Sequence, residues 1–285
     1  MRTLREAITE HRQAGQAIGH FNISDSNQLH ALAGASKEVG LPVIVGLSEG
    51  ERDFFPLSHA RALIDLYRAQ GIELFLNADH TYSVERVQRA ISAGVDSVVV
   101  DGAKLPSTEN TLLLTACVKY ARASGRDVVM EGELGYIGQS SKPLDELPEG
   151  VSIENLTTAQ EATRFVAETG IDCLAPAVGN VHGMLKHAAE PKLHPERVKE
   201  IAEATGVPLV LHGASGNTED EIRACIIAGV AVVHINTELR VAYRKGIEAS
   251  FAANPDEVAP YKFLAPAVSD MQQFVAGKLK VFAGQ

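Results

Sequence analysis

Three histidines each follow a short apolar run, and this placement makes them candidates for one shared site. They are His80 in ELFLNADH, His182 in CLAPAVGNVHG and His212 in PLVLHG. A single histidine would carry little weight, because most are satisfied or exposed side chains. Three at equivalent places indicate a cluster, and imidazole is the commonest protein ligand for a catalytic transition metal. The pattern therefore predicts a metal site with an open position, suited to Zn²⁺ acting as a Lewis acid.

Two carboxylates lie at equivalent strand ends. Asp79 directly precedes His80, and Glu133, two residues after Glu131, is the last acid of the run DVVMEGEL. Beside a cation, Asp79 should stay ionised and can move protons to or from a substrate oxygen; the alternative role is to orient a metal-bound histidine. Neighbouring side chains alternate along a regular strand. We expect Asp79 and His80 to face the same site because the strand ends there and its twist relaxes.

The elements that position these residues follow a regular rhythm of apolar runs and helical patterns. Stretches with apolar residues at helical spacing separate the runs, and several end in a glycine typical of a helix C-terminus. Apolar runs that alternate with amphipathic helices indicate a buried parallel sheet covered by helices. The predicted strands are 17–23, 42–48, 73–79, 96–102, 127–134, 172–178, 208–213 and 231–236.

Eight such units predict an α/β fold, a (β/α)8 TIM barrel, in a single domain spanning 1–285. A doubly wound open sheet is the alternative, although no GxGxxG motif follows the first strand. An extra helix is expected before the first strand, and others are expected around 255–262 and 266–282. Barrel enzymes place their chemistry at the carboxyl ends of the strands, where all the candidate residues lie.

Two strand-to-helix turns are candidates for binding phosphate. HGASG contributes Gly213 and Ser215, and HINTE contributes Asn236 and Thr237, after the catalytic candidate His234. Free backbone N–H groups at the start of a helix bind phosphate, and this barrel often uses the turns after strands seven and eight. The motif HGASG is weak by itself and gains weight beside a metal ligand.

Composition excludes several classes of partner. The formal net charge is −10 with dispersed lysine and arginine, which argues against nucleic acid and anionic membranes. The first residues form an amphipathic pattern without the apolar core of a signal peptide, and no apolar run is long enough to span a membrane. Three widely spaced cysteines are typical of small core residues in a reducing compartment. We expect a cytoplasmic enzyme.

One connection is unusually long. The stretch 135–156 reads GYIGQSSKPLDELPEGVSIENL and is rich in Gly, Ser and Pro. A long loop in a compact barrel is usually functional and often a lid. Its attachment directly after Glu133 favours a lid over a surface insertion.

Taken together, these motifs resemble the class II, metal-dependent fructose-bisphosphate/tagatose-bisphosphate aldolase family. The matching runs are NADHTYSVERVQRAISAGVDSVVVDGAKLPSTEN, MEGELGYIG, TGIDCLAPAVGNVHG, VPLVLHGASG and NTEL, spread over nearly the whole chain. The resemblance implies a TIM barrel that is a homodimer or homotetramer, with catalytic Zn²⁺ or another divalent metal. It also implies a phosphosugar substrate.

The resemblance further implies roles for individual residues. Asp79 matches the acid/base on the aldehyde side, and Glu133 matches a glutamate near or alternately on the metal. Ser48 matches a serine in the substrate pocket. The zinc ligands match His80, His182 and His212; positions around the ketose phosphate match Gly183, Lys186, Gly213 and Ser215, and a monovalent cation site matches Gly183, Gly213 and Ser215.

Two positions depart from the family pattern. The family usually carries a glutamate in the loop after ELG, where this chain has Ser140 and Ser141; Asp145, Glu146 and Glu149 are the substitutes, and the sequence does not choose between them. His234 stands where the family has an asparagine that contacts the enediolate. It can act as a hydrogen-bond donor, a proton shuttle or an extra ligand.

The resulting functional expectation is metal-dependent, reversible aldol cleavage. The substrate would be fructose or tagatose 1,6-bisphosphate, and the products dihydroxyacetone phosphate and glyceraldehyde 3-phosphate. The alternatives are a class II aldolase acting on another phosphosugar or a sugar acid, and a non-catalytic barrel. A Schiff-base aldolase is disfavoured, because it needs a lysine pointing into the barrel and no predicted strand interior has one.

Overall fold

The computed structural model describes residues 1–151 and 156–285 and contains a closed barrel of eight parallel strands. Their order around the barrel is β1-β10-β9-β7-β5-β4-β3-β2. The predicted (β/α)8 architecture is therefore confirmed. The strands are β1 (Ile18–Asn22), β2 (Val43–Leu47), β3 (Leu74–Thr81), β4 (Ser97–Val100), β5 (Val129–Leu134), β7 (Cys173–Pro176), β9 (Leu209–Leu211) and β10 (Val230–His234).

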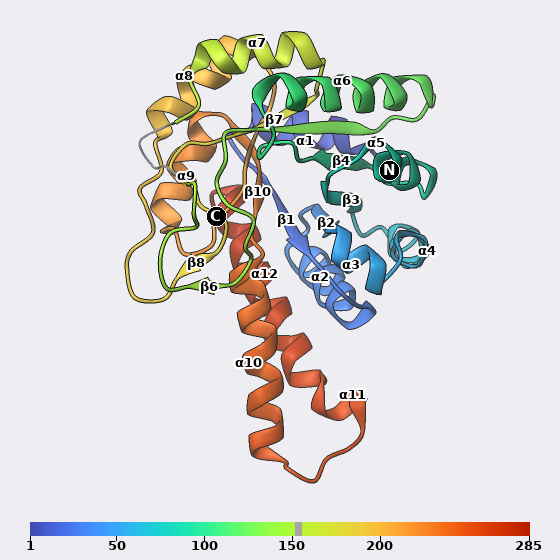
Figure 1. Cartoon of the computed structure of the whole chain (residues 1–285). Helices are drawn as coiled ribbons and strands as arrows, with labels where there is room; N and C mark the ends of the chain where they lie inside the picture. The colour runs from blue at the N-terminus through green and yellow to red at the C-terminus, as the bar shows by residue number, and fades with distance from the viewer. Residues whose placement is uncertain (152–155) are drawn as a thin grey trace.

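Helices cover the outside of the barrel (Figure 1). They pack apolar side chains onto the outward faces of the strands, which accounts for the continuous apolar runs in the sequence. Several of them end at a glycine in the left-handed conformation, including Gly40 and Gly170, as the sequence pattern predicts. These helices are α2 (Ser26–Val39), α3 (Glu49–Phe54), α4 (Leu57–Arg68), α5 (Val84–Ser92), α6 (Ser107–Ala123), α7 (Ala159–Thr169), α8 (Pro195–Thr205), α9 (Glu219–Ala228) and α10 (Thr237–Ala253).

The amino-terminal end of the barrel is closed by α1 (Leu4–Gln13), the extra helix expected before the first strand. A capping box between Thr3 and Glu6 starts this helix. Its buried face, Leu4, Ala7 and Ile8, joins a cluster of inward-facing apolar side chains. Those side chains include Ile18, Ile44, Phe75, Val129, Val210 and Val232. The lower part of the barrel interior is thus an apolar core.

The upper part of the interior is polar. Because side chains alternate along each strand, the inward-facing series continues upward from the apolar cluster into buried polar residues. Those residues are His20, Asn22, Asn77, Asp79, Glu131 and Glu133, with His212 and His234 at the ends of neighbouring strands. This change from apolar to polar along the barrel axis places the chemistry at the carboxyl ends of the strands.

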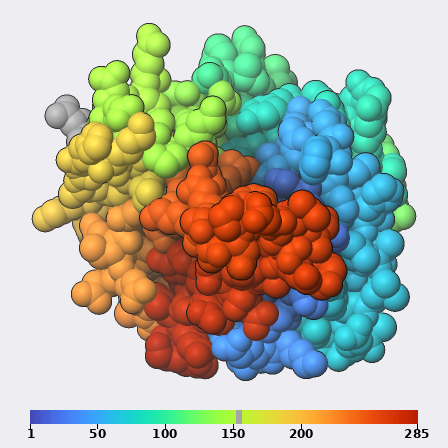
Figure 2. Space-filling view, turned by 90° about the horizontal axis from the view of Figure 1, so that it is seen from below, coloured from blue at the N-terminus to red at the C-terminus, as the bar shows by residue number. Residues whose placement is uncertain are grey.

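The helix α12 (Ala265–Ala283) packs against α10, α2 and β1, so it also covers the barrel. The far ends of α10 and α12, joined by α11 (Pro260–Phe263), form an arm that stands out from the barrel (Figure 1). Seen along that direction, α10 and α11 lie in front of the rest of the molecule (Figure 2). The expected helix at 266–282 is confirmed. The one expected at 255–262 is wrong in its bounds, because the short α11 starts only at Pro260, which suits the first turn of a helix.

The long connection after β5 contributes one strand to a small two-stranded sheet. Its strand β6 (Pro143–Leu144) pairs in parallel with β8 (Met184–Leu185), which follows β7 in the chain. The predicted lid spans 135–156, and part of it, 152–155, lies outside the described residues.

Within the described part of the chain, no helix is both long and apolar enough to cross a membrane.

Candidate metal centre and active site

The three predicted metal ligands converge at the carboxyl end of the barrel. His80 lies on β3, His182 lies in the connection after β7, and His212 directly follows β9. One ligand atom from each lies within 4.8 Å of those from the other two. The ring centroids are 5.0 to 5.7 Å apart and the rings meet edge to face. Side chains from three separate segments thus surround one point.

Two of these rings are oriented by acceptors at their Nδ1 atoms. His80 Nδ1 has an Asp101 oxygen as its hydrogen-bond acceptor, at 3.1 Å. His182 Nδ1 lies 2.7 Å from the carbonyl oxygen of Gly138. A metal-bound histidine usually donates its other ring N–H to a carboxylate or a carbonyl. Both contacts therefore leave Nε2 of each ring for a metal.

The third ring is oriented through the opposite nitrogen. His212 Nε2 lies 2.6 Å from Glu131 Oε1, while its Nδ1 is buried and has no hydrogen-bond partner. The cavity between the three histidines holds about 20 Å³, on the order of one water molecule or one ion. An orphaned imidazole nitrogen, a small cavity and two oriented imidazoles fit a divalent transition metal bound by three nitrogens.

Asp79 and His80 do both face this centre, but the physical reason differs from the predicted one. Strand β3 does not end at Asp79 and continues to Thr81. Its pairing with β4 shifts register between Ala78 and Thr81, and His80 adopts φ 37°. Such an irregularity re-aims a side chain. No other non-glycine residue in the described ranges has a positive φ.

Asp79 is held as a carboxylate. Its Oδ2 accepts a 2.8 Å hydrogen bond from Asn22, and its buried Oδ1 has no partner. Burial opposes ionisation, but the fields of His80, His20 and His212 outweigh it and hold the pKa of Asp79 well below its ordinary range. An ionised carboxylate with a vacant oxygen beside a metal site can accept a proton from a substrate.

Burial, with help from neighbouring His80 and His212, lowers the pKa of His182 to about 3. This ring is therefore neutral at physiological pH. Neutral imidazole is the form that binds a metal.

His234 lines the same cavity and is the middle ring in a stack of three histidines. Its ring lies 3.5 Å from that of His20 and 3.9 Å from that of His212, centroid to centroid. Burial, followed by the fields of His20 and His212, holds the pKa of His234 well below its ordinary value. A Cβ at residue 46 would lie 2.2 Å from the His20 ring, so Gly46 provides the space for that ring.

Most of the predicted phosphate-binding residues lie together. Gly183, Gly213, Ser215, Asn236 and Thr237 all line the cavity that contains the three histidines. At Gly213 the backbone has φ 60°, and a Cβ there would lie 2.5 Å from a carbonyl oxygen, which explains the glycine.

Two predicted residues lie apart from that group. Ser48 lines an adjoining cavity of about 240 Å³, which also contacts Asp79 and His80. Lys186 lines neither cavity and pairs with Asp145 at 3.0 Å.

Comparison with known proteins identifies the family. The family model for fructose-bisphosphate aldolase class-II matches residues 2–285. A probable fructose-bisphosphate aldolase of Bacillus subtilis is 35% identical over 285 residues, covering 98% of this chain and 96% of its own.

This chain belongs to the class II fructose-bisphosphate aldolase family. A 6-phospho-5-dehydro-2-deoxy-D-gluconate aldolase of Bacillus licheniformis is also 35% identical, over 284 residues, covering 98% of this chain and 94% of its own. The crystal structure of a putative fructose-1,6-bisphosphate aldolase from Coccidioides immitis superposes with a TM-score of 0.84 at 29% identity, covering 98% and 95% of the two chains. The chain is therefore an aldolase-family enzyme, a carbon–carbon lyase.

The loop that departs from the aldolase pattern approaches the site through a serine. Ser141 lines both the histidine cavity and the adjoining one, and it accepts a 3.5 Å contact from Asn236 Nδ2. Of the three candidate acids, Asp145 pairs with Lys186 and Glu149 lines an outer cavity of about 730 Å³. Neither of these two lines the histidine cavity.

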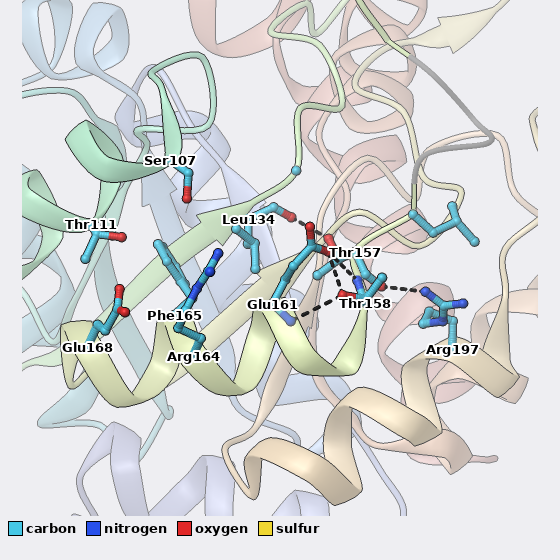
Figure 3. Close-up of a pocket in the computed structure, with 12 residues that line it drawn as sticks. Ser107, Thr111, Leu134, Thr157, Thr158, Glu161, Arg164, Phe165, Glu168 and Arg197 are labelled. Atoms are coloured by element: carbon cyan, nitrogen blue, oxygen red, sulfur yellow. Dashed lines mark hydrogen bonds between the residues drawn. The ribbon is translucent and has the colours of Figure 1, made fainter.

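A further cavity of about 600 Å³ lies outside the aldolase barrel, beside α6 and α7 (Figure 3). It contains Arg164, Glu161 and Arg197, and it includes none of the predicted metal or catalytic residues. The chemistry of the described residues is therefore concentrated inside the barrel mouth.

Several site residues escaped the sequence interpretation. His20 lies two residues before Asn22 on β1 and so faces the same way, a spacing that identifies it in retrospect. Glu131, two residues before Glu133, was a candidate from the sequence, but its contact with His212 was not predicted. Arg240, which lines the adjoining cavity, and its partner Glu51 carry no local signal, since they are 189 residues apart.

Proposed function

We propose that this protein catalyses reversible aldol cleavage of a ketose phosphate with a resident Zn²⁺ ion. The products are dihydroxyacetone phosphate and an aldehyde, and fructose 1,6-bisphosphate and tagatose 1,6-bisphosphate are the first candidate substrates. The observation that carries the proposal is the set of three oriented imidazoles around a cavity of about 20 Å³, beside the ionised Asp79.

His80, His182 and His212 would hold the metal, and Glu133 is placed to replace one of them. Its Oε1 is buried without a hydrogen-bond partner, 3.0 Å from His80 Nδ1 and 3.7 Å from His212 Nδ1. When bound there, the metal supplies Lewis-acid polarisation of the ketose carbonyl and hydroxyl oxygens. Zn²⁺ suits three nitrogen ligands with an open position.

Asp79 is the proton-transfer residue on the aldehyde side. Its low pKa keeps it ionised, and its vacant Oδ1 can accept the proton of the C4 hydroxyl as the C3–C4 bond breaks. The bond from Asn22 fixes the carboxylate plane, so the vacant oxygen keeps one orientation. In the direction of synthesis the same oxygen returns the proton.

The phosphate of the ketose would bind at the turns after β9 and β10. Ser215 and Thr237 offer hydroxyls, and the start of α10 offers backbone N–H groups with a favourable helix dipole. Gly183 and Gly213 allow close approach to the same cavity, where we also propose a monovalent cation. Lys186 would have to exchange Asp145 for the phosphate in order to contribute.

His234 and Asn236 would contact the dihydroxyacetone phosphate half of the substrate. The neutral His234 ring can donate one N–H to a substrate oxygen, and the stack on His20 sets its plane. Asn236 Oδ1 is buried without a partner, which leaves an acceptor for a substrate hydroxyl. We propose His234 as a hydrogen-bond donor rather than an extra ligand.

A second candidate is aldol cleavage of a different phosphosugar or sugar acid. It is favoured by the relative named 6-phospho-5-dehydro-2-deoxy-D-gluconate aldolase, which is as similar to this chain as the fructose-bisphosphate relative. We also infer that residues 1–285 form one catalytic domain, because the family match runs from residue 2 to 285. From the family resemblance alone, we further propose that the enzyme is a homodimer or homotetramer.

A substrate panel with metal control tests the proposal. Purified enzyme is stripped with EDTA, reloaded with Zn²⁺, and supplied in turn with fructose 1,6-bisphosphate, tagatose 1,6-bisphosphate and other ketose phosphates. Release of dihydroxyacetone phosphate should disappear on chelation and return with Zn²⁺. Activity that survives chelation and is trapped by borohydride would contradict the zinc mechanism.

A further inference from the structure

Arg240 lies beside the candidate metal centre, where the far end of a bound substrate would extend. It lies in the first turn of α10 and lines the 240 Å³ cavity that also contacts Asp79 and His80. The same side chain lines the outer cavity of about 730 Å³. Arg240 therefore borders both the cavity beside the metal centre and the outer cavity.

This guanidinium already has a counterion. Its Nη2 contacts Oε1 of Glu51, a residue of α3 that is only 7% exposed. The other carboxylate oxygen, Oε2, accepts three hydrogen bonds of 2.8 Å each, from the backbone N–H of Ser48, the Ser48 hydroxyl and Asn22 Nδ2. Glu51 is thus anchored on one oxygen and depends on Arg240 for the other.

The anchoring limits how far Arg240 can serve a substrate. Removing a partner from a buried carboxylate is costly, because the charge is left without compensation. An incoming phosphate or carboxylate would have to share Arg240 with Glu51 and would also meet the field of that second negative charge. Glu49, a second acid of α3, lines the same cavity. The attraction for a distal anion is therefore small.

We propose that Glu51 sets the specificity of this enzyme for the aldehyde half of its substrate by neutralising Arg240. The proposal rests on the aldolase function proposed above. The enzyme should accept ketose monophosphates whose distal end is uncharged nearly as well as ketose bisphosphates. Strong selection for a distal phosphate would need an arginine that is not already paired.

The test uses synthesis from dihydroxyacetone phosphate by the zinc-loaded enzyme. The measured quantity is the ratio of kcat/KM for D-glyceraldehyde 3-phosphate to that for D-glyceraldehyde. A ratio within one enzyme cancels any effect on metal binding or on Asp79. We expect a ratio within about tenfold of unity for the natural chain and a rise of at least about tenfold in Glu51→Gln. The double variant Glu51→Gln, Arg240→Met should lose that rise.

Two further variants keep the proposal falsifiable. Glu49→Gln removes a negative charge from the cavity that Arg240 lines, but Glu49 contacts Tyr82 and Arg52 rather than Arg240. The ratio of this variant should change by less than about threefold. Arg240→Met alone should lower the ratio by about tenfold, because Glu51 is then left as a negative charge without its counterion and repels the distal phosphate.

The outcomes separate the two proposals. Equal increases in Glu51→Gln and Glu49→Gln would overturn the role of the Arg240 contact, and so would a natural preference above about a hundredfold that Arg240→Met abolishes. If the natural enzyme consumes dihydroxyacetone phosphate with neither these aldehydes nor any other aldehyde, the proposed aldolase function itself fails.

Discussion

The two ends of the barrel use carboxylates in opposite ways. At the amino-terminal end, Asp96 and Asp172 each accept a strand N–H group, from Leu76 at 2.7 Å and from Met130 at 2.8 Å. Each also pairs with two arginines: Asp96 with Arg61 and Arg68, and Asp172 with Arg5 and Arg122. Every oxygen there is satisfied within the protein.

At the mouth, the buried carboxylates face histidines and keep oxygens without partners. Asp79 Oδ1 and Glu133 Oε1 are both buried and lack hydrogen bonds, as does His212 Nδ1. Orphaned polar atoms are costly unless an ion, a water molecule or a substrate compensates them. This difference indicates that charges at the lower end stabilise the fold. Those at the mouth remain available to the proposed cation and substrate.

The largest effect should follow from removing a predicted ligand at the mouth. In His212→Ala the orphaned Nδ1 disappears, and three metal ligands become two. We expect bound zinc to fall below stoichiometric amounts and aldol cleavage to fall at least about a thousandfold, because the carbonyl polarisation is lost. Metal analysis and a cleavage assay on the same preparation measure both. Stoichiometric zinc in the variant would show that the ligand set is wrong.

A smaller effect should follow from changing the residue that orients His212. Glu131→Gln keeps the size of the side chain but weakens the 2.6 Å contact to His212 Nε2. Loss of such a partner typically weakens metal binding about 10- to 100-fold. Competition with a zinc chelator measures the affinity, and saturating zinc should restore most of the activity. Unchanged affinity would mean that Glu131 does not orient the ligand.

Most of the fold could be predicted from the sequence, because strands buried on both faces read as continuous apolar runs. The position of each ligand histidine after such a run was sufficient to predict the cluster. The inward turn of both Asp79 and His80 was predicted for the wrong reason, since it depends on a register shift against β4 that local sequence does not encode. Alternation along a strand would have argued against it.

The contacts between site residues could not be predicted either, because they join residues that are far apart in the chain. Glu131 meets His212 across 81 residues of chain, and Arg240 meets Glu51 across 189. Such pairs depend on how the barrel closes and on the rotamers that its interior allows. Sequence patterns report the face on which a residue lies, but not which side chain it meets there.

The contrast between the two ends also predicts a variant that changes stability alone. Asp172→Asn removes the charge that holds Arg5 and Arg122 and weakens the bond to the Met130 N–H group. Hydrogen bonds to charged groups contribute about 1.5–3 kcal/mol, so the free energy of unfolding should fall by about 2 kcal/mol. Thermal or urea unfolding measures this. The kcat of the zinc-loaded variant should stay within about twofold, since lower-end residues serve stability.

The smallest effect is the pH dependence of that loss, and its sign is determined by the pKa shift. Burial opposes ionisation of Asp172, but Arg5, the Met130 N–H group and Arg122 outweigh it and lower its pKa in the folded protein. A lowered folded pKa gives stability that is fully present above the unfolded pKa of about 3.9 and is lost as pH falls through the folded value. The stability difference between the natural chain and Asp172→Asn should therefore be constant from about pH 7 to 5 and shrink below about pH 4. A difference that instead grows on acidification would mean that the Asp172 contacts do not favour its charged form.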